Sequence, residues 1–361
     1  MENKEALLIV SYGGPEEIKD VEPFLNRLLF GKKVPEIRRQ TALQKYYNRH
    51  GHSPIQQECR DLIHALSSLI QKKNDSTLPF VIYWGNLYAP PLLNETIQQM
   101  SHDGISSFVL FLTSSFDSPQ SCQRYLQAVQ KGIEEIQTGC SLDLNHIEND
   151  STTDQPIDNR FIINKTAFYS NRFKKPNDIS MSFVKTPFFL NHPSYLRASA
   201  DALLETLAKN SLDHCFTEDA AFDQENEPLI LFSTHSLPIQ DAIAAHYQEQ
   251  FEEHCQHVIQ MIDSPNQSLN WKLVFQSRSG SPFESWTEPS LENEIRQYKK
   301  SHPNWNRLIV SPIGFFLENM ETVYDLDVEL AQLCQELEIT LYRVPTFGRK
   351  SRVVQMIVDF L

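Results

Sequence analysis

Short apolar runs and longer amphipathic stretches alternate along the first half of the chain. Three runs have the β-branched and apolar character of strands: Ala6–Ser11, Phe80–Trp84 and Phe108–Leu112. Apolar residues recur at helical spacing in four stretches: Val21–Phe30, Cys59–Ile70, Leu92–Met100 and Tyr125–Ile136. This order of strands and helices predicts a mostly parallel sheet with helices on both faces.

The same alternation begins again in the second half. Strands are expected at Leu229–Phe232, Leu273–Phe275, Leu308–Val310 and Leu341–Val344. Helices are expected at Tyr195–Leu207, Ile239–Ile262, Glu318–Leu337 and Val353–Leu361. We therefore expect two doubly wound α/β lobes, residues 1–190 and residues 191–344, with the C-terminal helix within 345–361 packing on the first lobe.

The alternation stops between residues 137 and 179. This segment is rich in Asn, Asp, Ser and Thr, and we interpret it as a long polar insertion in the first lobe. The sequence leaves its role open.

Functional groups in open α/β sheets lie in the loops that follow the strands. His235 comes directly after the expected strand Leu229–Phe232, and an imidazole suits both proton transfer near neutral pH and metal ligation. The alternative is that His235, one of 12 histidines, is an ordinary surface or core residue.

A second candidate is an acidic row in the expected helix Glu318–Leu337. Its carboxylates fall at i, i+3, i+7 and i+11, on one face of an α-helix: Glu318, Glu321, Asp325 and Glu329. Carboxylate oxygens are suitable ligands for a hard divalent cation. A solvated helix face is the alternative, although interspersed apolar residues favour a partly buried position.

Loops and helix starts of the first lobe carry cations and hydroxyls that could hold the carboxylates of a ligand. They are Lys32, Lys33, Lys45, Ser53, Ser121, Arg124 and Tyr125. For each of them the alternative is ordinary capping and solvation.

Composition excludes several classes of function. With 46 acidic against 32 basic residues, the formal charge of −14 opposes non-specific binding to nucleic acid and to anionic membranes. Six cysteines lie scattered without a CxxC pair, and the start of the chain does not have the pattern of a secretory signal, so we expect reduced thiols in a cytoplasmic protein. No apolar run is long enough to predict a transmembrane helix, and the glycines of Ser11–Glu16 match neither nucleotide-binding fingerprint.

Several segments occur in the order typical of one family: LLIVSYGGPEEIKDVEPFL, HGHSPIQQE, STHSLP, QSRSGSPFESWTEP and SPIGFFLENMETVYDLDVE. The chain resembles the ferrochelatases over most of its length outside 137–179. The resemblance implies two flavodoxin-like lobes with a porphyrin cleft between them. It also implies a lyase of haem biosynthesis that inserts Fe2+ into the porphyrin.

The resemblance also assigns residues. The family's invariant histidine matches His235, its catalytic glutamate matches Glu321, and its acidic line to or from the cleft matches Asp325 and Glu329. These four are the expected metal-handling residues. Which of His235 and Glu321 takes the proton and which the metal stays open.

The expected substrate is coproporphyrin III, with protoporphyrin IX as the alternative. Tyr12 stands before the glycines, as in the actinobacterial-type coproporphyrin group, where the matching tyrosine lies close to the metal. In that group the positions matching Ser53, Ser121 and Tyr125 contact the macrocycle or its carboxylates. Lys32, Lys45, Arg124 and Trp286 complete the expected porphyrin-binding set.

The chain departs from the family at three places. Asn319 stands where most members have histidine, and Lys45 stands where arginine is common, which removes a bidentate fork. The last 27 residues contain no cysteine, so we expect no C-terminal iron–sulfur cluster and no permanently bound cofactor, with Fe2+ as substrate.

Other functions stay open at this point. The same residues would serve a cobalt or nickel chelatase for a modified tetrapyrrole. A porphyrin or haem carrier without catalysis is another possibility, and it would leave Glu321 dispensable. A third is a two-lobed protein that binds another small ligand. We expect a monomer without stable membrane insertion that makes transient contacts with neighbouring haem-pathway enzymes.

Overall fold

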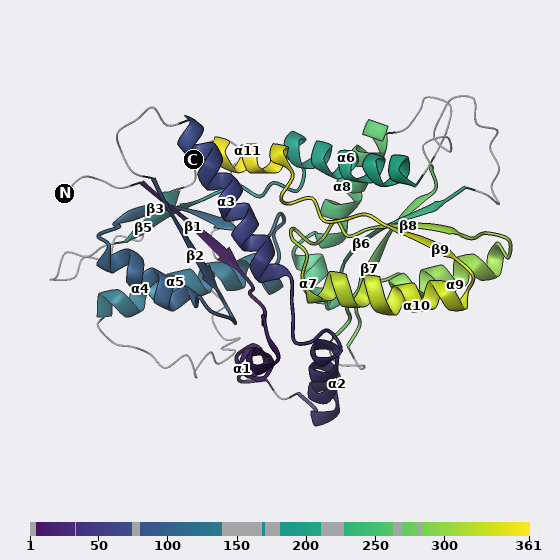
Figure 1. Ribbon diagram of the computed structural model, residues 1–361, viewed down its shortest axis with the longest axis horizontal. Coiled ribbons are helices and arrows are strands. Elements are labelled where there is room, and N and C mark those ends of the chain that lie inside the picture. Colours follow the sequence, from purple (N-terminus) through teal and green to yellow (C-terminus); the bar gives the residue numbers. More distant parts are fainter. Residues whose placement is uncertain are drawn as a thin grey trace. The chain divides into compact units, whose positions relative to one another are not determined.

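The computed structural model (Figure 1) describes residues 5–32, 34–73, 80–138, 168–169, 181–210, 227–262, 269–279 and 284–361. The chain divides into two compact units. Unit 1 consists of Met1–Thr113, Cys122–Pro187 and Phe360–Leu361, and unit 2 consists of Ser114–Ser121 and Phe188–Asp359. Two α/β lobes are therefore confirmed, and the main division falls between Pro187 and Phe188, near the expected residue 190.

Unit 1 is built on a five-stranded sheet in the order β2-β1-β3-β5-β4. Its strands are β1 (Glu5–Ser11), β2 (Phe80–Asn86), β3 (Ser107–Leu112), β4 (Phe168–Tyr169) and β5 (Ser182–Lys185). All neighbours are parallel except the edge pair of β4 and β5. The inner strand β1 is buried on both faces, as its unbroken apolar run indicates.

The helices of unit 1 are α1 (Ile18–Leu29), α2 (Glu36–Tyr47), α3 (Ile55–Lys73), α4 (Leu93–His102) and α5 (Arg124–Thr138). A short π-helix, η1 (Pro119–Gln123), precedes α5. Helix α2 was not predicted from the sequence, because Leu43 is its only buried residue and its apolar periodicity is weak. Leu43 packs with Phe24 of α1 and Ala89 in a small core of its own.

Unit 2 is built on a fully parallel sheet in the order β7-β6-β8-β9. Its strands are β6 (Leu229–His235), β7 (Trp271–Gln276), β8 (Arg307–Ser311) and β9 (Thr340–Arg343). Trp305, Leu326 and Leu330 are fully or almost fully buried in the core beside this sheet. All four strands were expected.

The helices of unit 2 are α6 (Pro193–Lys209), α7 (Ile239–Ala244), α8 (Tyr247–Ile262), α9 (Leu291–Ser301), η3 (Thr322–Leu330), α10 (Ala331–Glu336) and α11 (Ser351–Asp359). We expected a single helix over Ile239–Ile262, and this prediction is wrong. The segment is divided into α7 and α8 at His246, whose φ of 47° is incompatible with a continuous right-handed helix.

The C-terminal helix also differs from the expectation. We expected it on the first lobe, but α11 belongs to unit 2 and lies beside α6 (Figure 1). Ion pairs fix this arrangement: Lys350 pairs with Glu205, and Arg352 Nε lies 3.2 Å from Asp201 Oδ2. The apolar face of α11 is buried. Its ion-pair partners Asp201 and Glu205 lie one turn apart on the same side of α6.

The polar insertion at 137–179 lies outside the described residues except for Gln137, Thr138, Phe168 and Tyr169. Among the helices that the structure describes, none combines the length and the apolar character that crossing a membrane requires.

Candidate active site

The site of unit 2 begins at the carboxyl ends of β6 and its neighbour β7. His235 is the last residue of β6 and pairs with Gln276, the last residue of β7. The chain after β8 crosses closely over β6, since a Cβ added to Gly314 would lie 2.0 Å from Thr234 Oγ1. Only glycine permits this approach, which brings the segment that carries Glu321 towards His235.

Two hydrogen bonds orient His235. The buried hydroxyl of Tyr247 donates to the His235 carbonyl at 3.0 Å and also lies 2.6 Å from Thr234 Oγ1. The Nδ1 atom of the imidazole lies within hydrogen-bonding distance of the Ser236 carbonyl. Because a carbonyl only accepts, Nδ1 carries a proton and Nε2 is the nitrogen available for chemistry.

Glu321 faces that nitrogen. Its Oε1 lies 3.4 Å from His235 Nε2, and the two side chains are 46% and 27% exposed, respectively. Burial alone would lower the pKa of His235. The charge and hydrogen bond of Glu321, the Ser236 carbonyl and the charge of Asp325 together outweigh burial, so the pKa of His235 lies above its ordinary value.

The four expected metal-handling residues do not form one cluster. Asp325 accepts a hydrogen bond from Ser277 Oγ, and Glu329 is exposed on the following turn. Among the described residues, no group of three or more His, Cys, Asp or Glu side chains is arranged to hold a metal ion. The structure thus brings His235 and Glu321 together, and metal handling by Asp325 and Glu329 stays a prediction.

The acidic row is also not the α-helical face that we expected. The helix begins at Met320 and is a π-helix over η3, whose wider turns change the angular spacing of Asp325 and Glu329. Glu318 lies before the helix and pairs with Arg343 instead of joining the row. Arg343, Thr322 and Gln276 were not predicted from the sequence, although the Asn319-x-x-Thr322 spacing resembles a helix-capping pattern.

Six of the expected porphyrin-binding residues belong to unit 1: Tyr12, Lys32, Lys45, Ser53, Arg124 and Tyr125. Tyr12 is 39% exposed, and its ring packs edge-on against Tyr88, with 4.8 Å between centroids. Burial, followed by the charge of Arg124, lowers the pKa of Lys32. The positive charges of Lys32 and Arg124 are close enough to affect each other, so an anionic group bound between them would be stabilised.

The other unit 1 candidates are less accessible. Lys45 is half-buried in the last turn of α2. Ser53 and Tyr125 are only 2% and 6% exposed, and the Ser53 amide donates to the Pro15 carbonyl at 2.9 Å. Contact of Ser53 and Tyr125 with a ligand stays a prediction.

Ser121 and Trp286 belong to unit 2. The hydroxyl of Ser121 lies 3.2 Å from Ser114 Oγ and 2.9 Å from Ser118 Oγ. Trp286 is half-buried in the loop after β7, and the Arg278 guanidinium lies over its ring at 5.7 Å from the centroid. A cation over the ring offers both a flat surface and positive charge.

A histidine–glutamate pair at the carboxyl edge of a parallel sheet combines a proton acceptor with potential metal ligands at the place where α/β sheets carry their sites. Comparison with known families agrees: the ferrochelatase model matches residues 4–149 and 163–361. The chain therefore belongs to the ferrochelatase family, enzymes of the lyase class that insert metal into porphyrins.

Several curated relatives align over nearly the whole chain. A ferrochelatase from Rhodopirellula baltica is 30% identical, over 98% of this chain and 84% of its own length. Coproporphyrin III ferrochelatases from Corynebacterium glutamicum and Streptomyces griseus are 25% and 26% identical, each over 99% of this chain and over 83% and 84% of their own lengths. Among solved structures, SirB from Bacillus subtilis with Fe3+ aligns over 99% of this chain and 93% of its own, with 9% identity and a TM-score of 0.49.

Proposed function

We propose that the protein inserts Fe2+ into coproporphyrin III and that His235 and Glu321 carry the reaction. The observation that carries this proposal is the 3.4 Å approach of Glu321 Oε1 to His235 Nε2. The choice of coproporphyrin III is supported by the names of the Corynebacterium and Streptomyces relatives and by Tyr12 before the glycines.

The reaction releases two N–H protons from the macrocycle and takes up one ferrous ion. A neutral His235, with its proton on Nδ1, presents a lone pair on Nε2 that can accept the two protons one after the other, the first passing to solvent before the second is taken. The Glu321 carboxylate stabilises the imidazolium that results and offers a route for the proton to solvent, since it is half-exposed. His235 or Glu321 can also bind the iron transiently, because imidazole and carboxylate are both suitable ligands for ferrous iron.

Coproporphyrin III carries four propionate groups, and protoporphyrin IX carries two. Lys32, Lys45 and Arg124 supply cations that could pair with such carboxylates. Our proposal includes a cytoplasmic monomer without a permanently bound cofactor or iron–sulfur cluster, with Fe2+ as substrate and transient contacts to neighbouring haem-pathway enzymes.

The test is anaerobic insertion of Fe2+ into coproporphyrin III and into protoporphyrin IX, followed by the loss of porphyrin fluorescence. We expect higher kcat/KM with coproporphyrin III and a loss of about 100-fold or more in His235→Ala and in Glu321→Gln. Glu336→Gln, an exposed carboxylate of α10, serves as the matched control.

Three outcomes would contradict the proposal in different ways. Tight porphyrin binding without insertion would favour the carrier. Preference for protoporphyrin IX would overturn the substrate alone. Full activity in Glu321→Gln would remove Glu321 from the reaction.

A further inference from the structure

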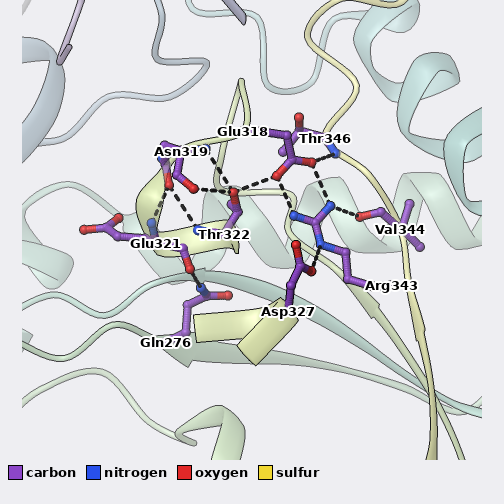
Figure 2. Close-up of polar contacts among 9 residues, drawn as sticks. All are labelled: Gln276, Glu318, Asn319, Glu321, Thr322, Asp327, Arg343, Val344 and Thr346. Carbon is purple, nitrogen blue, oxygen red and sulfur yellow. Dashed lines mark hydrogen bonds and ion pairs between the residues drawn. The ribbon is translucent and has the colours of Figure 1, made fainter. Parts of the chain in front are cut away.

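The helix that carries Glu321 begins with a reciprocal cap (Figure 2). Asn319 Oδ1 accepts hydrogen bonds from the backbone amides of Glu321 at 2.9 Å and Thr322 at 3.1 Å. In return, Thr322 Oγ1 accepts from the Asn319 amide at 3.0 Å. These reciprocal hydrogen bonds have the pattern of a capping box, with asparagine at the N-cap and threonine three residues later.

The cap is tied to a buried ion pair. Thr322 Oγ1 donates to Glu318 Oε2 at 2.7 Å, and Glu318 receives two parallel hydrogen bonds from the Arg343 guanidinium (Figure 2). The Thr346 amide adds a further bond to Glu318 Oε1 at 2.8 Å. Glu318 and Arg343 are only 17% and 15% exposed, so the pair is well shielded from solvent.

Two observations make this pair a firm anchor. Burial alone would raise the pKa of Glu318, but the hydrogen bonds and charge of Arg343, with Thr322 and Thr346, hold it below its ordinary value, so the carboxylate stays ionised. Arg343 Nε also lies 3.2 Å from Asp327 Oδ1, on η3. A bidentate pair fixes geometry as well as charge.

Glu321 is held at its backbone on both sides. Its amide donates to Asn319, and its carbonyl accepts from Gln276 Nε2 at 3.4 Å. Its side chain is 46% exposed, and its Oε1 lies 3.4 Å from His235 Nε2. These backbone contacts set the direction of the Cα–Cβ bond of Glu321, and that direction determines whether the carboxylate points towards His235.

We propose that Asn319 and Thr322 are positioning residues for Glu321: their reciprocal cap, anchored on the Glu318–Arg343 pair, aims the Glu321 carboxylate at His235. This inference rests on the proposed role of Glu321 in metal insertion. It gives Asn319 a function of its own through its side-chain oxygen, without any transfer of protons or metal.

The first test removes and restores the cap. Asn319→Ala should lower kcat about tenfold, because a displaced first turn misaligns a reacting group, and should leave KM for coproporphyrin III within about twofold. Asn319→Ser keeps an acceptor oxygen at the cap and should recover most of kcat. Thr322→Val should behave like Asn319→Ala, and Thr322→Ser like the parent protein.

A matched control separates positioning from stability. Ser290 caps α9 in the same unit, with its Oγ accepting from the Asn293 amide at 3.4 Å. Ser290→Ala should lower the Tm as much as Asn319→Ala does while kcat stays unchanged. Equal losses of kcat in the two variants would overturn the inference.

A double-mutant cycle tests whether the cap acts through Glu321. In a Glu321→Gln background, Asn319→Ala should cause no further loss of the residual insertion rate, followed over hours. An undiminished tenfold loss in that background would overturn the inference and leave the proposed function intact. Full activity of Glu321→Gln by itself would instead show that the proposed function is at fault.

Discussion

At the residue scale, the proposed reaction depends on the protonation state of His235. The imidazole must be neutral to accept a proton or bind iron, yet Glu321, Ser236 and Asp325 all favour its charged form. Burial works in the opposite direction. The positive charge on His235 is therefore retained to higher pH than in a free histidine, and the neutral form that the proposed reaction needs gains population as the pH rises.

We predict that kcat/KM rises with pH through a pKa above 6.5. In Glu321→Gln the largest influence that raises this pKa is gone, so the His235 pKa should fall. The shift is measured directly by NMR titration of the imidazole, assigned with His235→Gln, so that it does not depend on activity. An unchanged His235 pKa in Glu321→Gln would contradict the pairing of the two side chains.

At the element scale, strands were easier to predict than helices. The buried strands β1, β6 and β8 have unbroken apolar runs bounded by turns, which leave little choice of structure. Helix α9 was missed because most of its surface is polar, with only Leu291, Glu294 and Ile295 buried. The π-helix η3 has no local signal at all, since its apolar residues fit an α-helix equally well.

The candidate site could be predicted only in part. The strand-end position of His235 and the resemblance to ferrochelatases led to the His235–Glu321 pair. The ion pair of Glu318 with Arg343 could not be found this way, because 25 positions separate the two residues and only the parallel arrangement of β8 and β9 brings their segments together. Interactions between distant parts of a sequence depend on topology, which local patterns do not encode.

The junction between α7 and α8 allows a prediction of stability. His246 has a φ of 47°, a region that costs a residue with a Cβ about 1 kcal/mol. His246→Gly should raise the free energy of unfolding by up to about 0.5 kcal/mol, because relief of this cost slightly exceeds the added entropy of the unfolded chain. Urea denaturation of the parent, His246→Gly and His246→Ala measures the difference. Destabilisation by glycine would show that the His246 side chain itself stabilises the junction.

At the scale of the whole molecule, the net charge of −14 acts differently on the two proposed substrates. A divalent cation is attracted and a porphyrin with four carboxylates is repelled, and salt weakens both effects. Between about 50 and 300 mM salt, we expect kcat/KM for Fe2+ to fall a fewfold and kcat/KM for coproporphyrin III to rise. Sucrose at matched osmolality is the control. A fall for both substrates would indicate that the cations of unit 1 outweigh the overall charge.

The segment Ser114–Ser121 follows β3 of unit 1 in sequence but is part of unit 2. The Ser115 carbonyl accepts from the amides of Phe189 and Leu190, at 3.0 and 2.9 Å. Phe116 packs edge-on against Tyr247, whose hydroxyl holds the His235 carbonyl.

This arrangement affects how the protein can be made or divided. During synthesis, Phe116 leaves the ribosome long before Tyr247, so the surroundings of His235 cannot be completed until most of the chain has emerged. A shortened gene that starts at residue 188 would encode every strand of the second sheet but not the aromatic ring that packs on Tyr247. A separately expressed version of this unit therefore needs residues 114–121 joined ahead of Phe188.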